Sequence, residues 1–187
     1  MLIGYALCGS FCTISRSIRE MERLLSDGHE LVPIMSENIY TTDTRFGTAQ
    51  DISDRIVGMC GKQIIHTIEK AEPLGPKLKL DLLIIAPCTG NTLAKLAHGI
   101  TDTAVTMAAK AHSRQDRPML IALATNDAMS ANLANIGTMA NKKSVYFVPM
   151  EQDDPEKKPH SLVAAFDKIP ECATAAMEGR QLYPLFL

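Results

Sequence analysis

The chain lacks the features that would place it in a membrane or on a nucleic acid. No apolar run approaches the ~20 residues that a membrane-spanning helix needs. Residues 1–8 are apolar but have no basic lead-in, so they predict a first strand and not a signal peptide. The net charge is −2, and no cluster of Lys and Arg is present to bind a phosphate backbone. Neither nucleic acid nor a membrane is therefore expected as a partner.

Cysteine pairs and metal-ligand spacings are also missing. The cysteines are odd in number, scattered and without a CxxC motif: Cys8, Cys12, Cys60, Cys88 and Cys172. Four histidines lie apart from them in the sequence: His66, His98, His112 and His160. We therefore expect no disulfide, a reducing cytoplasmic compartment and no metal site.

Apolar strand patterns alternate with helical patterns along the chain. The predicted strands are 1–7, 29–35, a short one at 62–68, then 82–86, 119–124 and 144–148. The predicted helices are 14–27, 51–61 (or from Thr48), 91–97, 101–111, 129–141 and 162–178, the last kinked by Pro170. This alternation predicts one α/β domain over residues 1–187, a three-layer, doubly wound parallel sheet of Rossmann or flavodoxin type.

Four segments do not fit a helix or a strand. Residues 40–50 predict a mobile loop, and residues 72–78, with two prolines and a glycine, predict another. Residues 151–160 form a highly charged loop. The tail QLYPLFL is apolar, and we expect it to dock on a neighbouring subunit or on the chain's own core.

The segment 80–111 is the most informative part of the sequence. A wholly apolar strand is predicted to break at Pro87, is followed by the polar residues Cys88–Thr92, and then becomes a helix of small residues. The unpaired N–H groups and the positive dipole end of such a helix favour an anionic ligand. The sequence therefore predicts an anion site at this strand-to-helix turn.

Three further polar clusters follow predicted strands, namely Gly9–Thr13, Ser36–Asn38 and Thr125–Asp127. In a doubly wound sheet the carboxyl ends of the strands meet at one edge, so the four clusters predict one binding site. Taken singly, Ser10, Thr13, Asn91 or Asp127 could each be a helix cap, and Ser36 and Asn38 are common in turns. Neither GxGxxG nor GxxxxGK[ST] is present, and the neutral donors suit a monophosphate.

Cys88 and His66 can each be interpreted as a catalytic or as a structural residue. Cys88 at a helix start could be an activated nucleophile, but a buried packing cysteine is the more common case. His66 could be catalytic, but a structural histidine is more common at such a position. Both alternatives stay open from the sequence.

The motif residues resemble those of the flavin mononucleotide-binding flavoproteins, which include the homo-oligomeric flavin-containing cysteine decarboxylases and flavin prenyltransferases. The segment Ala86–Lys95, followed by Gly99, Ile100 and Asp102, resembles the signature of that family. The first-turn cluster, Ser36, Asn126 and Met129 match further positions. The resemblance implies FMN held by Gly9, Ser10, Thr13, Ser36, Asn38, Pro87, Cys88, Thr89, Asn91 and Thr92. It also implies a substrate facing Asn126 and Met129. For a substrate with two carboxylates we expect a nearby cation, with Lys95 and Arg45 as candidates.

The chain departs from the decarboxylases and prenyltransferases at three places. Residues 72–77 contain no histidine, whereas the decarboxylases carry one in this segment. Residues 123–130 lack the proline and tryptophan of the decarboxylases' methionine motif. Met107 stands where the prenyltransferases usually have an arginine. These differences favour another reaction, although a decarboxylase stays an alternative.

A closer resemblance, which includes the charged loop 151–160, is to oxidoreductase subunits of spore-forming bacteria within this family. It implies a partner chain of NAD(P)-binding type, aromatisation of a dihydropyridine dicarboxylate, and the mother-cell cytoplasm. The family implies a homo-oligomer, a trimer or a dodecamer. A non-catalytic binding or scaffold subunit is the second alternative.

Overall fold

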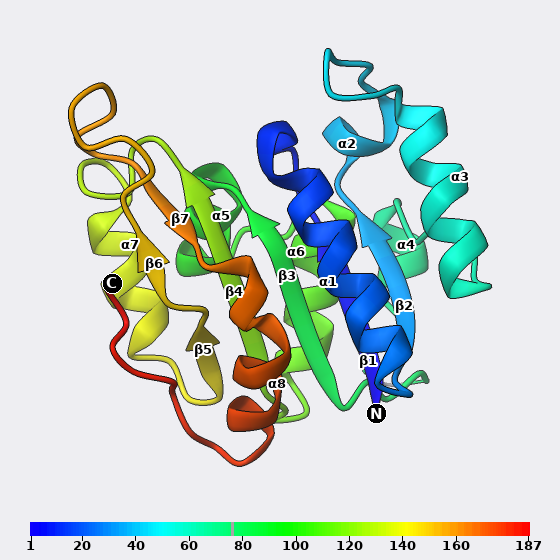
Figure 1. Cartoon of the computed structure of the whole chain (residues 1–187). Coiled ribbons are helices and arrows are strands. Elements are labelled where there is room, and N and C mark those ends of the chain that lie inside the picture. Colours follow the sequence, from blue (N-terminus) through cyan, green and yellow to red (C-terminus); the bar gives the residue numbers. More distant parts are fainter. Residues whose placement is uncertain (76) are drawn as a thin grey trace.

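Five parallel strands form the centre of the sheet. The computed structural model describes residues 1–75 and 77–187, and its sheet has seven strands (Figure 1). The parallel strands lie in the order β2-β1-β3-β4-β5, which confirms the predicted doubly wound sheet. Their bounds are β1 Leu2–Leu7, β2 Glu30–Met35, β3 Leu82–Cys88, β4 Met119–Thr125 and β5 Val145–Phe147.

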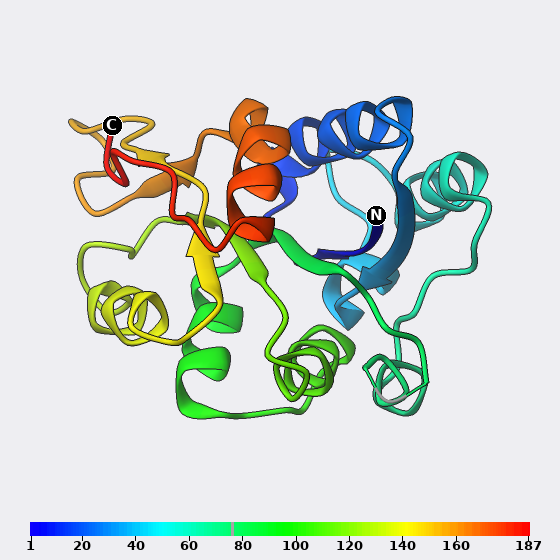
Figure 2. The same cartoon turned by 90° about the horizontal axis from the view of Figure 1, so that it is seen from below.

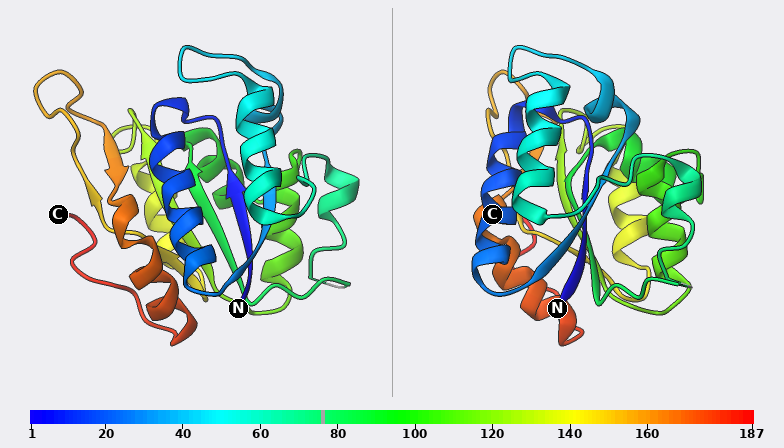
Figure 3. Two further views of the ribbon diagram at one scale, coloured as in Figure 1. Left: turned by 45° about the vertical axis from the view of Figure 1, so that its right-hand side comes forward. Right: turned by 90° about the vertical axis from the view of Figure 1, so that its right-hand side faces the viewer.

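Helices cover both faces of the sheet, as predicted. On one face lie α1 (Ile14–Ser26), α3 (Ala49–Cys60) and α8 (Ile169–Met177), and on the other lie α4 (Ile68–Ala71), α5 (Gly90–His98), α6 (Ala104–Ser113) and α7 (Leu133–Ala140) (Figures 2 and 3). Every residue of β3 is buried, because helices shield it on both sides. The predicted apolar face of α1, with Ile14, Ile18 and Met21, is likewise buried.

The helix ends follow the local sequence. Thr48 and Thr89 cap α3 and α5 with their side chains, and Thr103 forms a capping box with Thr106 at α6. Gly99, with a φ of 72°, ends α5 in the left-handed conformation that glycine adopts without strain. The break that we predicted between the two helices is thereby confirmed.

The predicted helix 162–178 is wrong in its first part. Leu162–Ala164 is strand β7, which pairs antiparallel with β4 and with β6 (Met150–Glu151), so the sheet is mixed and not wholly parallel. A 3₁₀ turn, η2 (Phe166–Lys168), then leads into α8. Pro170 lies in the first turn of α8, where its missing N–H costs nothing, and it does not kink the helix. The charged loop 151–160 therefore forms most of the connection between β6 and β7.

Smaller errors concern the limits of other elements. The strand predicted at 62–68 is reduced to one isolated pairing, Ile34 with Ile65, followed by α4. Strand β3 does not break at Pro87 but continues to Cys88, because Pro87 O accepts from Cys8 N at 3.1 Å. Residues 37–41 form the short helix α2 (Glu37–Thr41), and α7 begins at Leu133 and not at Met129. In the predicted loop 72–78, residue 76 lies outside the described residues.

The apolar tail lies along the edge of its own sheet. Met150 N donates to Leu185 O and Leu187 N donates to Met150 O, each at 2.8 Å. Leu182 and Leu185 pack against the core, whereas Tyr183, Phe186 and Leu187 stay exposed. In the described part of the chain, no helix is both long and apolar enough to traverse a membrane.

His112 in α6 makes the stability of the fold dependent on pH. Its ring is buried, Nε2 lies 2.8 Å from Pro118 O, and Nδ1 has no partner among the described residues. Burial lowers the pKa of His112 below its ordinary value of 6.5. Below about pH 6.5 the unfolded chain therefore binds a proton that the folded chain takes up only at lower pH, so stability falls as pH falls through this window.

We predict that His112→Gln, whose side-chain amide can still donate to Pro118 O, flattens this decline. Urea unfolding at pH 7.5 and pH 5.5 measures it. His160→Gln is the matched control, because His160 is exposed, and it should keep the wild-type decline. An equal loss of stability in the wild type and His112→Gln would contradict the assignment.

Candidate functional site

A cleft of about 540 Å³ opens at the carboxyl edge of the sheet, at the ends of β1, β3 and β4. The loop between α2 and α3 and the β6–β7 hairpin rise above this edge (Figure 1). Three of the four predicted polar clusters contribute to the cleft. Its lining residues are Gly9, Ser10, Phe11, Cys12, Thr13, Arg45, Phe46, Thr89, Ala124, Thr125, Asn126, Asp153, Lys158 and Val163.

The first turn is held in shape by its own hydroxyl groups. Ser10 N donates to Cys8 O at 2.8 Å, and Thr13 Oγ1 lies 2.9 Å from Ser10 O and 3.1 Å from Ser10 Oγ. The turn continues as η1 (Phe11–Thr13) into α1, without a side-chain cap from either residue. Ser10 and Thr13 are therefore not simple helix caps, and their hydroxyls border the cleft.

The second cluster lies against the first. Ser36 N donates to Leu7 O at 3.0 Å, and a Cβ added to Gly9 would lie 3.4 Å from Asn38 Cβ. Ser36 Oγ is buried and has no hydrogen-bond partner among the described residues. A buried hydroxyl without a partner destabilises the protein, and a ligand group that reached this corner and bonded to it would remove that cost.

The hydroxyls of the central turn are used within the protein. Thr89 Oγ1 accepts from Thr92 N at 3.2 Å and lies 3.0 Å from Thr92 Oγ1, which in turn contacts Cys8 Sγ at 3.4 Å. Asn91, the other candidate cap, is exposed. Thr89 therefore caps α5, borders the cleft, and links the third cluster to the end of β1.

Cys88 is fully buried beneath this turn. Burial raises its pKa well above the ordinary value, and the nearby Cys8 raises it further. The pKa of Cys8 is also raised by burial, to about 11, although a hydrogen bond from Thr92 opposes the shift. A thiol that stays protonated and inaccessible is a packing group, so the nucleophile interpretation of Cys88 is not favoured.

Sequence reasoning missed a polar network that packs against the start of α5. Asp127 Oδ1 accepts from Thr125 Oγ1 at 2.5 Å and from Asn132 Nδ2 at 2.9 Å. A Cβ on Gly90 would lie 2.5–2.8 Å from these three side chains, so any other residue there would force the network to shift. Asn132 is buried. An asparagine inside a predicted helix, a few residues after Thr125–Asp127, was the available signal.

A second unpredicted network fixes the end of β3. Tyr5 Oη donates to Ser17 O at 3.1 Å, and Ser17 Oγ donates to Ala86 O at 2.6 Å. All three residues are fully buried. Strand β1, helix α1 and strand β3 are thus joined just before the turn that borders the cleft.

The predicted substrate-facing residues are not all in one place. Asn126 and Arg45 border the cleft, whereas Met129 does not and donates its amide to His160 O at 3.0 Å. Lys95 lies outside the lining, in an ion pair with Asp102 at 2.8 Å. Lys158, in the β6–β7 hairpin, is a lining cation that the sequence did not single out.

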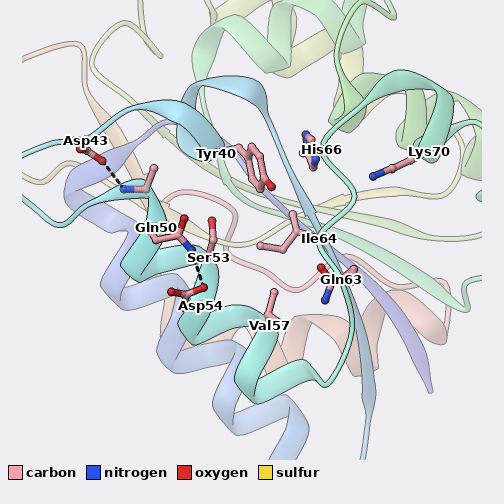
Figure 4. A pocket seen from close by; sticks show the side chains of 11 residues that line it. Tyr40, Asp43, Gln50, Ser53, Asp54, Val57, Gln63, Ile64, His66 and Lys70 are labelled. Atoms are coloured by element: carbon pink, nitrogen blue, oxygen red, sulfur yellow. Dashed lines mark hydrogen bonds between the residues drawn. The ribbon is translucent and has the colours of Figure 1, made fainter.

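His66 borders a separate pocket of about 560 Å³ beside α3 (Figure 4). Its ring stacks on Tyr40 with centroids 3.8 Å apart and an angle of 6° between planes. Lys70, Gln63 and Ser53 are polar neighbours in the same lining. Stacking on Tyr40 fixes the plane of the His66 ring at the wall of this pocket, away from the carboxyl-edge cleft.

Comparison with known proteins gives consistent results. The Flavoprotein family model matches residues 2–179. The chain is 42% identical over 185 residues to the B chain of dipicolinate synthase of Bacillus subtilis (strain 168), covering 99% of this chain and 92% of that one.

Solved structures agree with the sequence matches. The crystal structure of the B chain of dipicolinate synthase from Bacillus halodurans superposes with a TM-score of 0.91 at 39% identity, covering 100% of this chain and 95% of that one. The FMN-dependent cysteine decarboxylase SpaF superposes with a TM-score of 0.69 at 21% identity, covering 96% and 97%, which bears on the fold alone. The chain therefore belongs to the Flavoprotein family and, within it, to the family of the dipicolinate synthase B chain.

Proposed function

We propose that this chain is the flavoprotein-type subunit of a dipicolinate synthase, which acts with an A chain to oxidise dihydrodipicolinate to dipicolinate during sporulation. One observation carries the proposal. Similarity to the dipicolinate synthase B chain extends over nearly the whole length of both proteins, in sequence and in structure. The charged hairpin, which borders the cleft, is included in that match.

The reaction is a two-electron oxidation. The dihydropyridine ring loses a hydride equivalent and a proton, and its aromatic product keeps both carboxylates. A flavin bound in the cleft would supply the electron acceptor. The chain's own residues would then position the ring and balance the substrate's charge.

The donors in the cleft, together with Ser36 and Asn38 beside its first turn, support a flavin mononucleotide as the ligand. Ser36 Oγ is buried without a partner among the described residues, next to the turn that carries Ser10 and Thr13. We propose that the phosphate lies at this corner, with Gly9 and Asn38 beside it. Thr89 and the backbone around Pro87 would face the ribityl chain and ring, with Cys88, Asn91 and Thr92 behind them. Asn126 would face the substrate, with Met129 near the same turn.

The proposal also concerns a nicotinamide cofactor and the oligomeric state of the chain. NAD(P) gains no support from the relatives, and it stays a prediction about the A chain alone. Related folds include a dodecameric FMN-dependent decarboxylase and a cage protein in complex with FMN. We propose that this chain also forms a homo-oligomer and works in the cytoplasm of the mother cell. The small dicarboxylate is its proposed substrate.

A decarboxylase remains the second candidate, favoured by the fold it shares with cysteine decarboxylases. The absent histidine in residues 72–77 and the absent proline and tryptophan in residues 123–130 favour the synthase subunit. A decarboxylase releases carbon dioxide from a cysteine-ended peptide, whereas a synthase subunit leaves that peptide unchanged.

We predict that dipicolinate forms from dihydrodipicolinate over many turnovers only when the A chain and this chain are mixed with FMN, whereas this chain loaded with FMN forms at most one dipicolinate for each flavin on its own. Ultraviolet absorbance of dipicolinate measures the product, and each chain alone is the control. Full activity of the A chain without this chain would contradict the proposal.

We also predict that Ser36→Ala weakens FMN binding by roughly tenfold or more, since a hydrogen bond to a charged group is worth about 1.5–3 kcal/mol. The same change removes an unpaired buried hydroxyl, so the flavin-free protein should be as stable as the wild type or more stable. Flavin fluorescence titration and thermal unfolding measure the two effects. Ser26→Ala, at an exposed helix end, is the control; unchanged FMN affinity in Ser36→Ala would contradict the phosphate position.

A further inference from the structure

Two cationic side chains from distant segments border the carboxyl-edge cleft. Arg45 comes from the loop between α2 and α3, and Lys158 comes from the β6–β7 hairpin. The two segments rise on opposite sides of the first turn (Figure 1). Arg45 and Lys158 are the cations of the described lining, and the rest of its polar groups are mostly neutral.

Arg45 is held at the mouth of the cleft by its neighbour. Its guanidinium carbon lies 4.8 Å from the centre of the Phe46 ring, a cation–π arrangement on an exposed aromatic side chain. Stacking uses the face of the guanidinium and leaves its N–H edge free to bind a carboxylate with two parallel hydrogen bonds.

Lys158 is positioned by an acidic neighbour in the hairpin. Its Nζ lies 2.7 Å from Asp153 Oδ2, and this contact raises the pKa of Lys158 and lowers that of Asp153. The hairpin is ordered by further bonds, from Lys158 N to Asp154 O at 2.8 Å and from Gln152 Nε2 to Pro159 O at 2.9 Å. An ammonium group has three donors, so Lys158 can bind a second anion beside Asp153.

We infer that Arg45 and Lys158 each bind one carboxylate of a small, planar dicarboxylate in this cleft. The inference rests on the proposed function, which supplies a substrate with two carboxylates on one ring. Moving a dianion from water into a cleft is unfavourable without compensating charge, and hydroxyls alone do not supply that charge. Lys95 is not available for this role, because it pairs with Asp102 outside the cleft.

The size of the cleft agrees with this assignment. A volume of about 540 Å³ falls within the usual range for small-molecule sites, so it can hold a planar acid in addition to part of a larger ligand. Because the two cations lie on separate loops, they select a ligand with two anionic groups over one with a single group.

The test is a binding cycle on the purified chain with FMN added. Calorimetry measures the affinity for dipicolinate, with two carboxylates, and for picolinate, with one. Arg45→Gln and Lys158→Gln should each weaken dipicolinate binding about tenfold. Only one of the two changes should weaken the binding of picolinate, because picolinate has a single carboxylate. Lys157→Gln, on the neighbouring exposed residue, is the matched control and should leave both affinities unchanged.

Asp153→Asn separates binding from a structural role. If Lys158 binds the ligand, Asp153→Asn removes a competing negative charge and leaves dipicolinate affinity equal or higher. If the ion pair merely fastens the hairpin, Asp153→Asn and Lys158→Gln weaken binding equally, which would overturn the inference. Loss of FMN affinity in Arg45→Gln or Lys158→Gln, with dipicolinate binding intact, would also overturn it.

Activity of the reconstituted pair separates this inference from the proposed function. If the pair makes dipicolinate but both Gln variants keep the wild-type KM, the two-cation assignment alone fails. If the pair makes none while the binding cycle gives the expected pattern, the proposed function fails and the dicarboxylate site stands.

Discussion

The buried central strand is the constraint on which the rest of the structure depends. All seven residues of β3 are buried, with helices on both faces, so its register and its end point are fixed by packing. Ser17 binds the carbonyl of Ala86, and Cys8 binds that of Pro87, so β1, α1 and β3 end together. The turn that follows therefore has one position, and the cleft forms where the neighbouring strands end beside it.

The polar groups along this edge divide into two sets with different roles. Thr89, Thr92 and the Asp127 network are satisfied within the protein and set the start of α5. Glycine at position 90 lets three side chains approach its backbone closely, which is explained by packing and does not require an anion site. Ser36 belongs to the other set, since its buried hydroxyl lacks a partner among the described residues. We therefore propose the first turn and Ser36 as the anion site, in place of the turn after β3.

The sequence predicts the parallel half of the fold well, because strand burial and helix periodicity are local signals. Helix α1, strand β4 and the glycine stop at Gly99 agree with their predicted positions. The β6–β7 hairpin was missed because Leu162–Ala164 is short and its pairing with β4 depends on residues distant in the sequence. For the same reason Lys158 was not predicted at the cleft, and Lys95 was predicted there although Asp102 holds it elsewhere.

The central claim is that this chain itself carries out the redox step, and a single-turnover experiment tests it directly. The chain is loaded with FMN and mixed with dihydrodipicolinate, in the absence of oxygen and of the A chain. Visible absorption follows the flavin, and ultraviolet absorption follows dipicolinate. The account predicts that the flavin is reduced and that one dipicolinate forms for each flavin. A flavin that stays oxidised in the presence of substrate would contradict it and would favour a binding or scaffold subunit.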